Sequence, residues 1–209
     1  MSDHVWLSIA MTKAGSAPSV NTDTSGTDVN KTVKAITLNE KGERVSEDLC
    51  ANRIWTVEDT PFIENMPDFF SAQGYRIVSS HVADILRRFN LGGGALYPVK
   101  EGVYQADNKT RIGGDYFSWI FGNTKTAFLE QFSPNVEAMS GSGKRNWCSI
   151  ASSNIDNDVA VSSNALSGPD VWVDPQLFKS IFLSGPLGDA LVEGGFKKSL
   201  FLIRCRVIS

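Results

Sequence analysis

Residues 79–94, SSHVADILRRFNLGGG, carry the clearest local signal in the chain. Apolar side chains recur there at the i, i+3, i+4, i+7 spacing of one helix face, at Val82, Ile85, Leu86 and Phe89. A serine before them can cap the helix, and three consecutive glycines after them end the pattern. This stretch therefore predicts a short helix with one buried face.

On both sides of this helix, segments in which apolar and polar residues alternate outnumber helical segments. This pattern predicts an α+β fold with a mostly antiparallel sheet and a few short helices. Strands are expected at residues 5–11, 33–38, 53–57, 95–99, 115–121 and 200–208. In the last of these, Ile203 and Cys205 alternate with two arginines, so one face of the strand is expected to be buried.

Two of the helices are expected near the C-terminus. Asp174 and Pro175 form a cap signal, and apolar residues from Leu177 to Phe182 follow at helical spacing. A shorter helix is expected from residue 187 to a glycine pair at 194–195. Because each lies on the apolar stripe of its element, Phe182 and Ile203 are both expected in the core.

The chain has 209 residues, of which 42% are hydrophobic and 21% charged, and this predicts a single domain over residues 1–209. Residues 1–65 are expected to form an N-terminal β-rich layer, and residues 66–209 an α+β part. Residues 16–32 are rich in Ser, Thr, Asn, Asp and Gly, which is typical of a long loop.

The composition also bears on location and partners. No apolar run approaches the ~18 to 20 residues of a membrane span, and the first residues do not resemble a secretion signal. A cytoplasmic protein without membrane contact is expected. The formal net charge of -3 argues against direct binding of nucleic acid through general phosphate neutralisation.

Residues with catalytic or metal-binding chemistry are few. Cys50, Cys148 and Cys205 lie far apart without a CxxC pair, so they are expected to be reduced and buried. The two histidines have no metal-ligand spacing, and His81 is expected on the exposed first turn of the helix within residues 79–94. The chain is therefore expected to have no catalytic residues, no metal site and no cofactor.

Two loops resemble the beginnings of ligand-binding motifs without completing them. Residues 140–145, SGSGKR, lack the first glycine and the Ser/Thr that a P-loop needs. Residues 156–158, DND, begin like a calcium loop, but the glycine and the terminal glutamate are missing. Each is expected to be an ordinary loop or turn.

Carboxylates gather in two stretches, 56–70 and 146–178, that contain no Lys or Arg. If these stretches share one face, that face would steer a basic partner. Solvated loops of an acidic protein are the simpler interpretation. The candidate partner-binding residues are Glu58, Asp59, Glu64, Asp68, Asp156, Asp158, Asp170 and Asp174.

Several segments follow one another in an order typical of one family. They are VSSHVADIL at 78–86, ALYPV at 95–99, DYFSWIF at 115–121, and a C-terminal stretch from Asp174-Pro175 to Phe196. In this order they resemble the bacterial immunity proteins encoded beside polymorphic toxins, of the class called Imm-eleven. The resemblance extends over residues 68–208 and is looser in the N-terminal third. Residues 16–32 and 140–146 are insertions relative to the family pattern.

The resemblance implies a protein that binds a cognate toxin in the cytoplasm and blocks its active site or substrate entry. Such toxins are often nucleases, so the acidic stretches would occupy a surface that the toxin uses for phosphates. The implied partner is a protein. The resemblance brings no catalytic residues, and the oligomeric state stays open.

Two alternatives remain beside this interpretation. The chain could be a ligand-binding protein or an enzyme whose pocket is built from distant segments, with Tyr97, Tyr116 and Trp119 as an aromatic wall. Core packing is the simpler explanation for these three aromatics, since all fall on expected strands. The chain could also be a scaffold domain without a dedicated ligand.

Overall fold

The computed structural model describes residues 3–13, 17–24, 28–139, 147–150 and 155–208. Within these residues the chain forms an α+β fold, as the sequence predicts, with three α-helices and strands arranged in four sheets. None of the described helices is long and apolar enough to cross a membrane.

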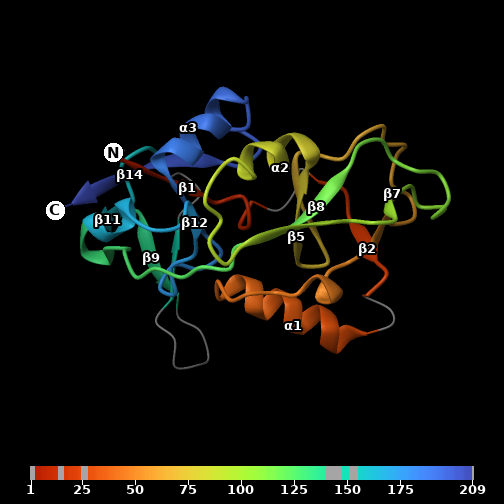
Figure 1. Ribbon diagram of the computed structural model, residues 1–209, viewed down its shortest axis with the longest axis horizontal. Coiled ribbons are helices and arrows are strands. Elements are labelled where there is room, and N and C mark those ends of the chain that lie inside the picture. The colour runs from red at the N-terminus through yellow and green to blue at the C-terminus, as the bar shows by residue number, and fades with distance from the viewer. Residues whose placement is uncertain (1–2, 14–16, 25–27, 140–146, 151–154, 209) are drawn as a thin grey trace.

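The largest sheet joins the two ends of the chain (Figure 1). Its neighbouring strands are antiparallel, except for the first two in the order given below, which are parallel. Within it Leu7 lies opposite both Phe182 and Ile203. Its strand order is β11 (Ala160–Ser162), β14 (Leu202–Ile208), β1 (Val5–Ser8), β13 (Ile181–Ser184) and β12 (Val171–Trp172).

A second sheet is fully antiparallel, and a third lies beside it. The second sheet has the order β4 (Phe69–Ala72), β5 (Tyr75–Ser79), β8 (Tyr116–Ile120) and β6 (Ala95–Pro98). The third has the order β2 (Val20–Thr22), β3 (Arg53–Thr56) and β7 (Gly102–Tyr104). A separate hairpin pairs β9 (Val136–Met139) with β10 (Trp147–Ile150).

Two helices pack together over the junction of the two larger sheets. Helix α2 (Ser80–Leu86) is capped by Ser79, and helix α3 (Gly185–Glu193) by Ser184, each through a side-chain oxygen that accepts a backbone N–H bond. Their apolar faces share one core cluster with Trp119 and Ile181. The prediction of a helix within residues 79–94 is therefore confirmed, with His81 on its exposed first turn.

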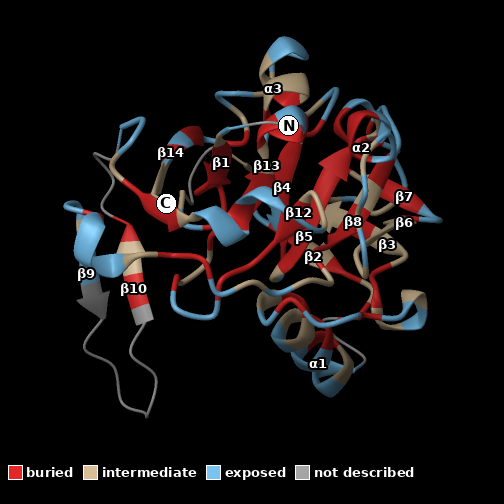
Figure 2. Ribbon diagram, turned by 60° about the vertical axis from the view of Figure 1, so that its left-hand side comes forward, coloured by how far each residue is buried: buried red, intermediate tan, exposed pale blue. Residues whose placement is uncertain are grey.

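Both faces of the five-stranded sheet are buried, and Figure 2 shows its strands largely in the buried colour. Trp6 and Leu183 face the cluster shared with α2 and α3, whereas Leu7 and Phe182 face a second cluster on the other side. Phe182 is 0% exposed and Ile203 is 9% exposed. Both are core residues, as predicted.

Residues 33–38 form part of a helix, so the strand predicted there is wrong. Helix α1 (Val29–Glu40) begins at Asp28, whose carboxylate accepts the N–H of Lys31 at 2.9 Å. Its buried side is formed by Thr32, Ala35 and Asn39, while the β-branched residues that suggested a strand lie partly on the exposed side. Burial of a polar stripe on a helix is a pattern that apolar periodicity does not detect.

The prediction of two helices near the C-terminus is half wrong. Helix α3 confirms the second of them, but residues 177–180 form a turn and residues 181–182 begin β13. Asp174 does cap a turn, through the N–H of Gln176, and Lys179 then takes a positive φ of 48° that no helix tolerates. Ile181 and Phe182 become central in the sheet because β1 and β12 pair on either side.

The N-terminal residues do not form a layer of their own. Strand β1 belongs to the five-stranded sheet, whereas β2 pairs with β3 and β3 pairs with β7 from residues 102–104. The loop predicted over residues 16–32 contains β2 and the first turn of α1. The strands predicted at 53–57, 95–99, 115–121 and 200–208 are confirmed as β3, β6, β8 and β14.

Candidate functional site

The eight carboxylates singled out in the sequence do not form one acidic face. Asp156 and Asp158 precede β11, at the left of Figure 1. The residues from 57 to 68 follow β3, whose neighbours β2 and β7 lie at the right of the same view. The candidate carboxylates therefore lie in two separate acidic regions and do not share the single face suggested by the sequence.

Most carboxylates of the 156–174 stretch are used inside the protein. Asp174 is 2% exposed and accepts three backbone N–H bonds, from Ala127, Phe128 and Gln176. Asp170 accepts the N–H of Asn90 at 2.7 Å. Asp174 is therefore a structural anchor that is not available to a partner, and one oxygen of Asp170 is bonded to the backbone.

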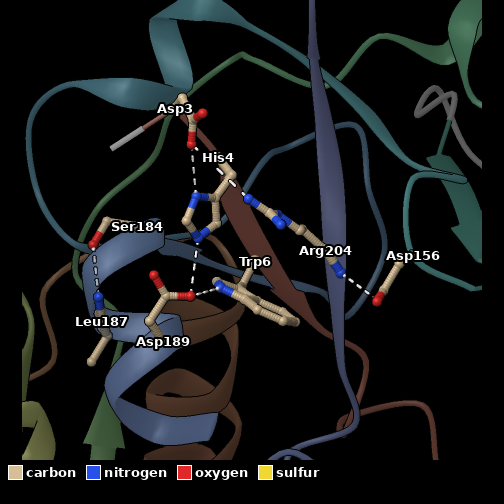
Figure 3. A network of polar contacts seen from close by, with 8 residues as sticks. All are labelled: Asp3, His4, Trp6, Asp156, Ser184, Leu187, Asp189 and Arg204. Atoms are coloured by element: carbon tan, nitrogen blue, oxygen red, sulfur yellow. Dashed lines mark hydrogen bonds and ion pairs between the residues drawn. The ribbon is translucent and has the colours of Figure 1, made fainter. Parts of the chain in front are cut away.

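Asp156 and Asp158 hold the turn that begins like a calcium loop. Asp156 accepts the backbone N–H of Arg204 at 2.9 Å (Figure 3). It also lies 3.6 Å from Lys197 Nζ. Asp158 accepts the N–H of Ile155 and the side-chain amide of Asn135. Among the described residues no group of His, Cys, Asp or Glu side chains could hold a metal ion.

The other acidic stretch is a rigidly anchored loop, residues 57–68, which we call the 57–68 loop. Gln105, which is 8% exposed, both donates to the carbonyl of Ile63 and accepts its N–H. The carbonyl of Glu64 accepts the N–H of Gly113 at 3.0 Å, and the N–H of Met66 donates to the Tyr116 hydroxyl at 2.8 Å. The backbone of residues 63–66, next to Phe62, is therefore held against the fold before any partner arrives.

At the outer side of this loop lies Phe62. It is 74% exposed, the highest value among the large apolar side chains of the described residues. Covering an exposed aromatic ring stabilises a complex, and aromatic residues are enriched at the centres of protein interfaces. An exposed ring on an anchored backbone has the properties of a binding residue.

Three carboxylates surround Phe62 in sequence. Glu58, Asp59 and Glu64 are all exposed, and no hydrogen bond or ion pair joins any of their three carboxylates to another residue that the structure describes. Asp68, the fourth acidic residue of the loop, differs because it accepts the Ser79 hydroxyl at 2.7 Å beside the N-cap of α2. The loop thus offers one aromatic ring and three uncommitted negative charges.

A histidine between carboxylates is a feature that the sequence did not reveal. His4 Nδ1 lies 3.0 Å from Asp3, and Nε2 lies 3.0 Å from Asp189, which also accepts the indole N–H of Trp6 (Figure 3). Both ring nitrogens are thus bonded to carboxylates, so this geometry does not provide a base for a nucleophile. Burial raises the pKa of Asp189, but the bonds from His4 and Trp6 outweigh it and lower the pKa overall.

The proposed aromatic wall does not exist. Tyr116 and Trp119 point to opposite faces of β8, since they lie three positions apart, and they belong to different core clusters. Trp119 is 0% exposed, and Tyr97 packs partly buried beside the cluster of Tyr116. These aromatics fill the core, as the simpler explanation predicts.

The three cysteines are all buried and free, as the sequence predicts. Burial raises the pKa of the Cys50 thiol to about 11, and it also raises the pKa of Cys205. Thiols with raised pKa values stay protonated and are poor nucleophiles. The P-loop-like residues 140–145 lie outside the described residues.

The 57–68 loop is therefore the candidate site, built by an aromatic ring, three free carboxylates and a preorganised backbone. Its only signal in the sequence was a run of carboxylates without Lys or Arg. No family model and no curated protein sequence matches the chain.

Proposed function

We propose that this protein neutralises a cognate bacterial toxin by binding it in the cytoplasm, with the 57–68 loop in the interface. The observation that carries the proposal is the exposure of Phe62 between carboxylates on an anchored loop. Binding there would cover the active site or the substrate entry of the toxin. The action is occlusion, so no turnover is part of it.

The physical properties of the loop support a protein partner. An aromatic ring supplies apolar contact area, and surrounding charges supply long-range attraction. Because the backbone is held by Gln105, Gly113 and Tyr116, little conformational entropy is lost on binding. Preorganisation of this kind increases affinity without new contacts.

The charge of the loop supports a basic partner, and a nuclease is the preferred class. A nuclease site carries Lys and Arg for phosphates. Glu58, Asp59 and Glu64 would replace the charge of the substrate there. The likeness of residues 68–208 to immunity proteins of polymorphic toxins supports a toxin as the partner but not the class of that toxin.

The test uses the C-terminal toxin domain encoded by the gene immediately upstream, purified with this protein. Phe62→Ala is expected to weaken the complex by about 2 kcal/mol, the scale of an aromatic interface residue. Phe132→Ala is the matched control, because Phe132 is also exposed, at 45%, but lies outside the loop. Equal affinity of the two variants would remove the loop from the interface.

A second measurement addresses the charges. The triple variant Glu58→Gln, Asp59→Asn, Glu64→Gln is expected to slow association and to reduce its dependence on salt. Asp68 is left unchanged, because its bond to Ser79 makes it structural. A control triple variant at the exposed residues Glu43, Glu137 and Glu193 changes net charge equally.

The outcomes separate the two parts of the proposal. Slower association in both triple variants would mean that only net charge matters, which would contradict a specific role for the loop. An upstream gene without a toxin domain, or failure of the two purified proteins to associate, would overturn the toxin-binding function itself.

A further inference from the structure

A cleft of about 540 Å³ lies between the two larger sheets. One wall comes from segments at the end of the five-stranded sheet, after β1 and before β13 and β14. The other wall is the edge strand β4 together with Arg76 of β5, and residues 17–19 close a third side. Pockets at such junctions between sheets are common places for small ligands.

The charges that line this cleft are positive. Lys13, Arg76 and Lys179 contribute to its described walls, and no Asp or Glu is among the described lining residues. Serine hydroxyls from residues 19, 71 and 199 add polar groups. A site with several cations and hydroxyl donors matches a carboxylate or a phosphate.

Arg76 is the central donor. Its side chain is 6% exposed, with one terminal nitrogen 2.8 Å from Glu40 and the other 3.0 Å from the Ser71 hydroxyl. The Nε–H has no hydrogen-bond acceptor among the described residues. A buried donor without a partner is costly. Nε is covered by neighbouring atoms, so a small shift of the guanidinium toward a bound anion would give it the missing acceptor.

Apolar side chains form the rest of the lining, including Met11, Phe69 and Phe201. Phe201 and Lys179 both have positive φ values, 46° and 48°, which non-glycine residues rarely adopt. Strained residues of this kind cluster where a ligand is held. Two of them on the wall of one cleft support a binding role.

We propose that this cleft binds a small organic anion, in which a phosphate or carboxylate headgroup is attached to an aromatic or acyl body. The headgroup lies toward Arg76 and Lys179, and the apolar body lies against Phe69 and Phe201. This inference goes beyond toxin binding and does not depend on it, because none of the residues 57–68 lines the cleft.

The probes are phenyl phosphate, phenylacetate, inorganic phosphate and phenol, titrated into the full chain by calorimetry and by backbone amide NMR. The two aromatic anions are expected to bind with Kd values below about 1 mM. Inorganic phosphate and phenol are each expected to bind at least about tenfold more weakly, since each has one half of the recognised chemistry. The difference in affinity between phenyl phosphate and phenylacetate identifies the preferred headgroup.

Lys179→Gln is expected to weaken binding of both aromatic anions by about tenfold, whereas the same change at exposed Lys109 leaves it unchanged. Arg76→Lys keeps a cation beside Glu40 but removes Nε, and the same loss is expected. Phe201→Ala should weaken phenyl phosphate while leaving inorganic phosphate unaffected. If Arg76→Lys does not fold, Lys179→Gln still decides the question.

The proposal is overturned if none of the four probes binds saturably, or if amide shifts appear away from Ser71, Lys179 and Phe201. Equal binding by the Lys109 and Lys179 variants would also overturn it. Equal affinity for phenol and phenyl phosphate would rule out an anion site, since it would show that only the apolar wall is recognised.

Discussion

The carboxylate of Asp174 accepts the backbone N–H of Ala127 at 2.7 Å, although 47 residues separate the two in the chain. The same oxygen also accepts the N–H of Phe128 at 2.8 Å. This contact fastens the segment after β8 to the turn after β12. An acidic residue that the sequence suggested for a partner is thus part of the internal framework.

Asp174→Asn is expected to lower the free energy of unfolding by about 2 kcal/mol. One oxygen of Asp174 accepts two backbone N–H bonds and the other accepts one. Asparagine replaces one of these oxygens with an NH2 group, so at least one buried N–H donor loses its acceptor. Urea unfolding followed by circular dichroism measures the effect. Asp59→Asn is the control, expected within about 0.5 kcal/mol of wild type because Asp59 is exposed. Equal stability of both variants would contradict the anchoring role.

Phe182→Ala is expected to cost about 3 to 5 kcal/mol, the usual range for a buried phenylalanine. The ring is 0% exposed and stacks on Trp172, with ring centroids 5.5 Å apart and planes at 8°. Phe62→Ala, which removes a ring that is 74% exposed, should change stability by less than about 0.5 kcal/mol. Thermal and urea unfolding of the pair test this contrast. A small loss at Phe182 would mean that the core relaxes around the cavity.

Gly188→Ala is expected to destabilise the protein by about 1 to 3 kcal/mol, because an added Cβ would collide with the Trp6 ring. In an unhindered helix the same change would be stabilising, so the sign of the effect tests the close approach of α3 to β1. Tryptophan fluorescence should shift as the ring moves. Glu193→Ala, at an exposed position of the same helix, is the control. Increased stability of Gly188→Ala would disprove the contact.

Lys125 should make stability depend on pH. Burial lowers its pKa to about 8, against a smaller opposing effect of Asp170, and its Nζ lies 3.6 Å from the centroid of the Trp172 ring. An unfolded lysine keeps its proton to about pH 10. Between these values the unfolded chain binds more protons than the folded one, so this group makes stability rise with pH.

We expect Lys125→Met to lose this rise. The free energy of unfolding of wild type relative to the variant should increase from about pH 8 to about pH 10 and be level below that range. Urea titrations at four pH values measure the difference, with exposed Lys109→Met as the control. A difference that is independent of pH would show that Lys125 titrates alike in both states.

Sequence patterns predicted elements whose formation depends on neighbours along the chain. Helix α2 was predictable because its cap and its apolar spacing lie within residues 79–94, although it ends at Leu86, before the three glycines expected to stop it. Strand β14 was predictable because Ile203 and Cys205 alternate with exposed arginines on one strand. In both, the local pattern and the final burial agree.

Tertiary contacts decided the elements for which local patterns are ambiguous. Ile181 and Phe182 fit a helical stripe, but pairing with β1 and β12 on both sides makes them a central strand. Residues 33–38 alternate like a strand, but Asn39 binds the carbonyl of Trp119 and the N–H of Phe121, which fixes a helix beside β8. The partners of Asn39 lie 80 and 82 residues away in the chain.

The same distinction applies to the candidate site. The sequence by itself determined where carboxylates are concentrated and that basic residues are missing among them. Only the tertiary structure decided that Asp174 is consumed by distant backbone N–H groups while Glu58, Asp59 and Glu64 stay exposed beside Phe62. The physical reason is that a carboxylate is available to a partner only if no nearby donor binds it, and those donors come from segments brought together by folding.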